Sequence, residues 1–315
     1  MARYDILIVG AGAAGLTAAL YAARRKLSTL VLSRDLGGQT ATTMDIENYP
    51  GVTFSTGPDL MDQFAAQAKK FGAEIKLDGV ANIVKTPDGF DLTGDSHTIY
   101  QARSIVLAFG KSHRHLDVPG EPEFMNKGVV YCATCDAPLF EGKPVAVIGG
   151  GNAAMDAVVL LSKIASKIYL VHRRDEFRAE AVMIDKVISD PKVELVLNST
   201  VTAIQGDQFV QNLVINTPAG ERILPVEGVF VEIGQTVSTE FLKGLIHLND
   251  VGEIIIDHNN QTTAAGIFAA GDVTTVPFKQ TVISAGEGAK AALAAYNYLQ
   301  GRDPGAKFAD QGYIK

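Results

Sequence analysis

The apolar residues of this chain fall into short continuous runs, and the first run is followed by glycines. Residues 6–9 read ILIV, which is typical of a strand buried on both faces of a parallel sheet. Residues 10–15 read GAGAAG, and residues 16–23 read LTAALYAA, where leucine and alanine favour a helix. The pattern predicts a strand, a glycine turn and a helix, in that order.

The glycine turn has the spacing of a dinucleotide-binding cradle. Gly10, Gly12 and Gly15 match GxGxxG, and Ala14 lies inside the same turn. The first glycine makes the turn, the second lets a pyrophosphate approach the backbone, and the third lets the helix pack on the strand. The phosphates then lie at the positive end of the helix. Because the next strand ends in Ser33 where an acid would bind a ribose, the ribose contact stays open, as does a plain glycine turn.

The same pattern occurs a second time. Residues 143–148 read KPVAVI, and they precede GGGNAA at 149–154 and an amphipathic helical pattern at 155–162. The second motif matches GxGxxA, and its candidate nucleotide contacts are Gly149, Gly151, Asn152 and Ala154. Two cradles imply two nucleotides. Since two nicotinamide sites would leave no route between them, we expect one site to hold a flavin dinucleotide.

The residues after the next strand indicate which nucleotide the second cradle prefers. The strand KIYLV at 167–171 is followed by HRRDEFR, so Arg173, Arg174 and Arg178 stand where an NAD site would place an acid. Guanidinium groups can bind the 2′-phosphate of NADP in bidentate fashion. We therefore predict NADPH at this site. The alternative is a solvated basic start of a helix.

The C-terminal part of the chain offers further contacts for a flavin. Residues 266–270 predict a short buried strand closed by Gly271 and Asp272, and a helix rich in small residues begins near Thr281. Asp272 could accept a hydrogen bond from a ribityl hydroxyl, and the helix N-terminus could stabilise negative charge on a reduced flavin ring. The alternative is an aspartate that caps the helix.

The chain has two cysteines, and they stand in the segment CATCD at 132–136. Zinc would require two more ligands, whereas the histidines lack ligand spacing, so no metal site is expected. A structural disulfide closing so short a loop would constrain little of the unfolded chain. The remaining interpretation is a dithiol that cycles between oxidised and reduced states, with Cys132 and Cys135 as its sulfurs. Asp136 is the expected acid or base, unless it only caps the following helix.

Composition narrows the classes of function. The net charge of −7 in 315 residues argues against a nucleic-acid-binding surface. Residues 6–23 carry no charge, but glycines at turn spacing interrupt them, which argues against a targeting signal or a membrane span. We expect a cytoplasmic protein. In the reducing cytosol, neighbouring cysteines are more often catalytic or metal-binding than a structural disulfide.

Taken together, GAGAAG, GGQ at 37–39, ENYPG at 47–51, CATCD, GGGNAA, HRRDEFRA and GIFAAGD resemble the low-molecular-weight thioredoxin reductases over almost the whole chain. The resemblance implies an α/β fold of two Rossmann-like three-layer nucleotide-binding domains, the second inserted into the first. It implies an FAD-binding domain at 1–116 and 247–315, an NADPH-binding domain at 117–246, and a homodimer. The implied FAD contacts, with those of the motifs, are Gly10, Gly12, Ala14, Gly15, Gly38, Gln39, Asn48, Gly271, Asp272, Lys279, Gln280 and Thr281.

The resemblance also implies a reaction. Electrons would pass from NADPH through FAD to the Cys132–Cys135 disulfide, and then to thioredoxin or a similar small dithiol protein. Cys135 would face the flavin, and Cys132 would attack the partner's disulfide. Because the dithiol and NADPH share one domain and both need the flavin, we predict that this domain swivels on two crossings, near 115–118 and 244–247.

The chain departs from the family pattern at several positions. Residues 137–140 read APLF, as in the flavoprotein of alkyl hydroperoxide reductase, where the family usually has glycine and an aromatic residue. Gln235 stands where the family usually has a histidine. A glutaredoxin-like or peroxidase-linked partner therefore stays as an alternative. A flavin enzyme that oxidises dithiols with oxygen and a non-catalytic redox sensor are separate alternatives.

Overall fold

The apolar run that opens the chain forms a strand with a parallel neighbour on each side. In the computed structural model, which describes residues 3–43 and 46–306, β1 (Arg3–Val9) pairs in parallel with β2 (Thr29–Ser33) and β6 (Ile99–Leu107). Its Ile6, Leu7 and Ile8 are fully buried. Both faces of the strand lie inside the protein, which explains why no polar residue alternates with the apolar ones.

The sheet around β1 is mixed. Within the described residues it has seven strands in the order β3-β2-β1-β6-β5-β4, and β17 pairs with β6. The pairs β2–β3 and β6–β17 are parallel, whereas β4–β5 and β5–β6 are antiparallel. The strands not yet named are β3 (Glu74–Leu77), β4 (Val80–Thr86), β5 (Gly89–Gly94) and β17 (Ile267–Ala269).

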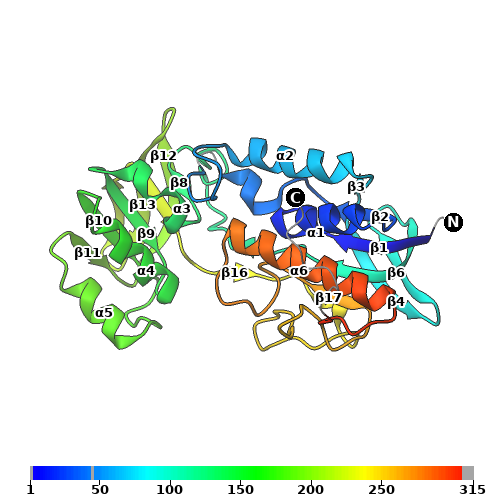
Figure 1. Cartoon of the computed structure of the whole chain (residues 1–315). Helices are drawn as coiled ribbons and strands as arrows, with labels where there is room; N and C mark the ends of the chain where they lie inside the picture. Colours follow the sequence, from blue (N-terminus) through cyan, green and yellow to red (C-terminus); the bar gives the residue numbers. More distant parts are fainter. Residues whose placement is uncertain (1–2, 44–45, 307–315) are drawn as a thin grey trace. The chain divides into compact units, whose positions relative to one another are not determined.

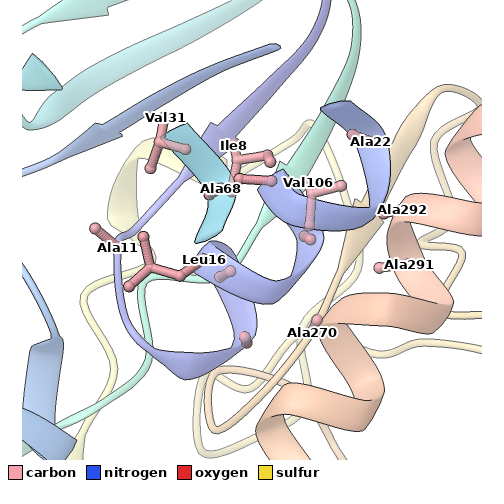
Figure 2. Packing of buried hydrophobic residues seen from close by; sticks show 14 of the residues in the cluster. Ile8, Ala11, Leu16, Ala22, Val31, Ala68, Val106, Ala270, Ala291 and Ala292 are labelled. Carbon is pink, nitrogen blue, oxygen red and sulfur yellow. The ribbon is translucent and has the colours of Figure 1, made fainter. Parts of the chain in front are cut away.

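Small residues let α1 (Ala13–Arg24) and α6 (Thr281–Leu299) of this first unit pack very closely. The unit also contains α2 (Gly57–Lys70) and a short 3-10 helix, η1 (Gly38–Thr42). α6 lies along α1 (Figure 1), and alanines such as Ala22, Ala291 and Ala292 form part of the buried cluster shown in Figure 2. A Cβ on Gly288 would overlap the carbonyl oxygen of Ala14. The two backbones are thus in contact at this position.

A second unit carries its own sheets. One is entirely parallel, in the order β11-β10-β9-β15-β8, and the other is antiparallel, in the order β12-β13-β14. The strands are β8 (Val129–Val130), β9 (Pro144–Ile148), β10 (Lys167–Val171), β11 (Val193–Val196), β12 (Thr200–Gly206), β13 (Val210–Thr217), β14 (Gly220–Pro225) and β15 (Gly228–Val231). The helices are α3 (Ala133–Asp136), η2 (Ala137–Phe140), α4 (Asn152–Leu161) and α5 (Ala181–Ile188).

The second unit interrupts the first in sequence. The first unit comprises 1–112 and 237–315, and the second comprises 113–236. The two connecting segments pair with each other as β7 (Ser112–His113) and β16 (Gln235–Thr236). The sequence placed the second crossing near 244–247 and the boundary at 246/247. In the structure this boundary lies earlier, at 236/237. The reason is that Leu242, in η3 (Glu240–Leu242), and Ile246 are buried in the core of the first sheet.

The predicted fold class is confirmed, because the chain forms two α/β units with parallel sheets, and the second is inserted into the first. The strand–turn–helix predictions at both glycine motifs are also realised, by β1 with α1 and by β9 with α4. Among the described residues, no helix is both long and apolar enough to span a membrane.

The contact at Gly288 makes a testable prediction about packing. Gly288→Ala should lower the free energy of unfolding by about 1–3 kcal/mol, because the added methyl group must push α6 away from α1. The measurement is chemical denaturation. Gly286→Ala is the matched control, since Gly286 lies in the same helix, an added Cβ there would meet no atom within 4 Å, and the variant should be stabilised by up to about 1 kcal/mol. Equal effects of the two variants would contradict the packing argument.

Candidate active site

The first glycine motif forms a turn in which two of the glycines are required by the fold itself. Gly10 has a φ of +108°, and a Cβ on it would overlap the carbonyl oxygen of Ala108. A Cβ on Gly15 would overlap the carbonyl oxygen of Gly10. Gly12 differs, because its φ of −80° suits any residue and the nearest atom to an added Cβ is 3.8 Å away. A methyl group would thus fit at Gly12 without a clash, and the fold itself does not require a glycine there.

Ser33 explains why no acid stands at the end of β2. Its Oγ is buried and accepts a hydrogen bond of 3.0 Å from the backbone N–H of Ala11, inside the turn. Asp35, the nearby acid, accepts a hydrogen bond of 3.0 Å from the N–H of Gly38. Both side chains therefore shape the protein around the cradle, and the structure gives neither of them a ribose-binding role.

Two further predicted residues lie at the same turn. A Cβ built on Gly38 would stand 3.5 Å from the Cα of Gly12, and one built on Gly271 would stand 2.9 Å from the Cβ of Ala14. Gly38 and Gly271 both have positive φ, at +55° and +77°. Segments that are far apart in the sequence thus come together at the N-terminus of α1.

The remaining candidates for the flavin site are linked by hydrogen bonds near the N-terminus of α6. Thr281 Oγ1 lies 3.1 Å from Thr40 Oγ1, and Asn48 Nδ2 donates to Gln280 Oε1 at 3.4 Å. The side chain of Gln39 donates to the carbonyl oxygen of Lys111. The first unit therefore brings the predicted residues of both its sequence segments to one place.

Asp272 does not cap α6, which answers the alternative raised from the sequence. Its Oδ1 accepts a hydrogen bond of 3.0 Å from Ser284 Oγ. The N-cap residue of α6 is Gln280, and it makes no side-chain capping bond. The first turn of α6 also contains no acidic residue. A helix N-terminus of this kind retains donors and partial positive charge for an anion.

Lys279 belongs to a charged cluster that the sequence did not reveal. Its Nζ donates to the carbonyl oxygen of Thr274 at 2.6 Å and lies 3.4 Å from Glu253, which also binds Lys111 at 2.5 Å. Burial, followed by the positive charge of Lys111, lowers the pKa of Lys279. Lys111 lies more than a hundred residues before Glu253 and Lys279 in the sequence, so no sequence motif could show the contact of all three side chains.

The second glycine motif repeats the geometry of the first. Gly149 has a φ of +153°, and a Cβ on it would overlap the carbonyl oxygen of Glu232. A Cβ on Gly151 would meet no atom within 4 Å, and its φ of −102° is ordinary. Ala154 is fully buried, and Asn152 Oδ1 accepts a hydrogen bond of 2.9 Å from the N–H of Glu180. The open space again faces the N-terminus of a helix, α4.

The three arginines gather beside this second cradle. Arg173, Arg174 and Arg178 are exposed, and their positive charges, after burial, contribute to lowering the pKa of His172. The backbone N–H of Arg178 donates to the carbonyl oxygen of Gly150 at 2.7 Å. Of the ion pairs formed by the described residues, none involves these arginines. Their guanidinium groups are thus available to a ligand phosphate.

The two cysteines form a disulfide in the same unit. Cys132 and Cys135 have Cα atoms 5.3 Å apart, and the N–H groups of Cys135 and Asp136 donate to the carbonyl oxygen of Cys132. Asp136 is buried, with 8% of its surface exposed. In the described part of the chain, no cluster of three or more histidine, cysteine or acidic side chains could hold a metal ion.

Sequence reasoning missed a network next to Cys132. The hydroxyl of Tyr131 donates to Glu121 Oε1 at 2.8 Å and lies 2.9 Å from His115 Nδ1. Glu121 is 1% exposed and also accepts the N–H groups of Leu116 and Asp117. Burial, followed by Glu121, raises the pKa of Tyr131. Glu121 therefore links residues 116–117, at the start of the second unit, to Tyr131, which follows β8 and precedes Cys132.

A histidine faces the position where the family histidine is missing. His113 Nδ1 lies 3.5 Å from the amide of Gln235, and its ring packs on Tyr131 with centroids 5.2 Å apart. Burial lowers the pKa of His113. The imidazole absent from β16 is thus present on its neighbour, β7.

The chain matches a family model described as pyridine nucleotide-disulphide oxidoreductase over residues 4–292. It is 40% identical over 301 residues to the thioredoxin reductase of Listeria monocytogenes, with 94% of each chain covered. It is 41% identical over 303 residues to an alkyl hydroperoxide reductase subunit from Pseudomonas aeruginosa, covering 94% of this chain and 58% of that protein.

Solved structures give the same result. The thioredoxin reductase of Streptococcus pyogenes superimposes with a TM-score of 0.90 at 36% identity, covering 95% of this chain and 99% of that one. The thioredoxin reductase of Giardia duodenalis gives 0.89 at 36% identity, covering 95% and 100%.

The middle glycines allow a test that separates binding from folding. Gly12→Ala and Gly151→Ala should change the free energy of unfolding by no more than about 1 kcal/mol, since each glycine is a helix N-cap with room for a methyl group. The methyl group would occupy the space of the pyrophosphate. We expect Gly12→Ala to lose bound flavin, and Gly151→Ala to bind pyridine nucleotide about tenfold or more weakly.

These losses are measured by visible absorbance and by titration calorimetry. Each variant serves as the control for the other, because each should leave the site of the other unit intact. Unchanged binding in both variants would show that the two turns are not cradles.

Proposed function

The chain belongs to the pyridine nucleotide-disulphide oxidoreductase family, and we propose that it is an NADPH-dependent thioredoxin reductase. One observation carries the proposal. The Cys132–Cys135 disulfide lies in the same unit as a dinucleotide cradle flanked by three arginines. The curated relatives and the solved structures named above as thioredoxin reductases support the same activity.

The first unit is suited to hold FAD. Its open cradle at Gly12, its uncapped α6 N-terminus and the carboxylate of Asp272 would bind the pyrophosphate, the flavin ring and a ribityl hydroxyl in turn. FAD, when bound, supplies the carrier that links two-electron transfer from a nicotinamide to a disulfide. Gln39, Asn48, Lys279, Gln280 and Thr281 would complete the site.

The second unit is suited to hold NADPH. The pyrophosphate would lie at Gly151 and the N-terminus of α4, and the 2′-phosphate would lie among Arg173, Arg174 and Arg178. We propose that this unit rotates about the paired crossings β7 and β16, so that the dithiol and the nucleotide take turns in the reaction.

In this proposal the Cys132–Cys135 disulfide is first reduced and then exchanges with a disulfide of thioredoxin. Reduction breaks its S–S bond with two electrons, and Asp136 supplies a proton to the sulfur that would otherwise leave as a thiolate. Cys132 then attacks a disulfide of thioredoxin, and Cys135 resolves the mixed disulfide with release of reduced thioredoxin. We also propose that the protein forms a homodimer and acts in the cytoplasm.

A second candidate partner follows from the segment after the disulfide. Ala137 and Phe140 are buried, whereas Leu139 is 46% exposed. This segment resembles that of the alkyl hydroperoxide reductase flavoprotein, and the alkyl hydroperoxide reductase relative named above is 41% identical. A peroxidase-linked disulfide protein is therefore the alternative substrate.

The proposed function is tested by NADPH oxidation against a panel of thioredoxins, glutaredoxins and peroxidase-linked dithiol proteins. We expect turnover with a thioredoxin, and a loss of at least about 10³-fold in Cys132→Ser, because the attacking sulfur is gone. Cys132→Ser should still bleach the flavin when NADPH is added without oxygen. Turnover with peroxidase-linked proteins alone would favour the alternative, and the absence of turnover with every disulfide would favour a sensor.

Nucleotide preference is tested separately. The double variant Arg173→Ala/Arg174→Ala should lower kcat/KM for NADPH by about 10²- to 10⁴-fold, since each charged hydrogen bond contributes about 1.5–3 kcal/mol and about 1.4 kcal/mol is a factor of ten. The value for NADH should change by less than about threefold, because NADH has no 2′-phosphate. Lys186→Ala, which removes an exposed lysine of α5, is the control. Equal losses with both nucleotides would contradict the assigned role.

A further inference from the structure

Glu232 is a partly buried acid that no step above uses. It follows β15 directly, and its N–H donates to the carbonyl oxygen of Ile148 at 2.8 Å. Its own carbonyl oxygen is the atom that a Cβ on Gly149 would overlap. The backbone of Glu232 is therefore one wall of the second cradle.

The side chain of the same residue contacts the disulfide loop. Glu232 Oε1 accepts a hydrogen bond of 3.3 Å from the N–H of Ala133, the residue that follows Cys132. Glu232 thus contacts both the first glycine of the nucleotide cradle and the loop between the two sulfurs. The cradle at Gly149 and the disulfide are joined through this one residue.

The surroundings of Glu232 are acidic. Burial, followed by the negative charge of Asp156 on α4, raises the pKa of Glu232 to about 7, although the hydrogen bond from Ala133 opposes the shift. The titratable groups of the disulfide loop are Cys135 and Asp136 on α3 and Cys132 just before it, once the cysteines are reduced, and neither β8 nor β9 contributes a charged residue. The carboxyl group therefore changes its charge in the pH range where a reduced dithiol also ionises.

We infer that Glu232 is a positioning residue that holds the Cys132–Cys135 loop on the nucleotide cradle and sets how readily its sulfurs ionise. The inference rests on the proposed function in that it assumes a disulfide that is reduced in turnover. Opening the S–S bond takes up two electrons, and two protons complete the dithiol. A carboxylate beside the loop disfavours negative charge on sulfur, so that proton uptake is favoured. When Glu232 is neutral, this penalty is absent and a thiolate persists to lower pH.

The test is the rate of thiol alkylation as a function of pH. The FAD-loaded protein is reduced with dithiothreitol, freed from it without oxygen, and treated with iodoacetamide, and the modification of each cysteine is followed by mass spectrometry. Glu232→Gln keeps an acceptor for Ala133 but removes the charge. We expect the pH profile of its more reactive cysteine to lie about one pH unit below that of the wild type, equivalent to a thiol pKa lower by about one and to about three times as much thiolate near pH 8.

Two more variants make the result specific. Glu227→Gln removes an exposed carboxylate just before β15 and should leave the alkylation profile unchanged. Glu232→Ala removes both charge and acceptor, and we expect it to be alkylated faster as well and to show a lower melting temperature than Glu232→Gln. A Glu232→Gln profile that superimposes on the wild-type profile would overturn the inference.

The alkylation experiment needs no protein partner, so it can fail or succeed independently of the proposed function. A shifted profile without turnover on any disulfide protein would leave Glu232 in this role and reject the thioredoxin reductase activity. Turnover with thioredoxin and an unshifted profile would do the reverse.

Discussion

Contact between one backbone and another, where no side chain can fit, is the constraint on which the rest of this structure depends. At Gly10, Gly15 and Gly288 an added Cβ would overlap a carbonyl oxygen of a neighbouring segment. These contacts set the position of α1 against the sheet and against α6. At Gly12, by contrast, the N-terminus of α1 has room for an added methyl group, so this glycine is not required by the packing. The packing of the first unit and the proposed dinucleotide site thus have one physical origin.

The two glycine motifs share one turn geometry, although we propose a different nucleotide for each. In the first unit the strand that follows the helix ends in Ser33, which is used to hold the turn. In the second unit the corresponding strand ends in His172 and the arginines, whose charges face outward. The difference between the sites therefore lies in the residues after the second strand, while the turns themselves are nearly alike.

Local sequence predicted those parts of the molecule that local physical chemistry determines. The strand–turn–helix order at Gly10 and Gly149, and the pairing of Cys132 with Cys135, follow from residue spacing. The second domain boundary did not, because Leu242 and Ile246 belong to the first unit through burial, which spacing does not record. Glu232 was missed for a similar reason. It lies about a hundred residues after the cysteines in sequence, and only the sheet order β9-β15-β8 brings it to Ala133.

The insertion of one unit into the other has a consequence for how the chain is made. The first unit needs β17 to complete its sheet and α6 to pack on α1, and both come from the last part of the sequence. The second unit is complete by residue 236, and its entry and exit strands, β7 and β16, are neighbours. During synthesis at about 5–20 residues per second, the second unit can therefore form its core before α6, which packs on the alanine-lined face of α1, has been made. The N-terminal half would therefore emerge from the ribosome before its packing partner is made, and chaperones that shield apolar surface would act on that half first.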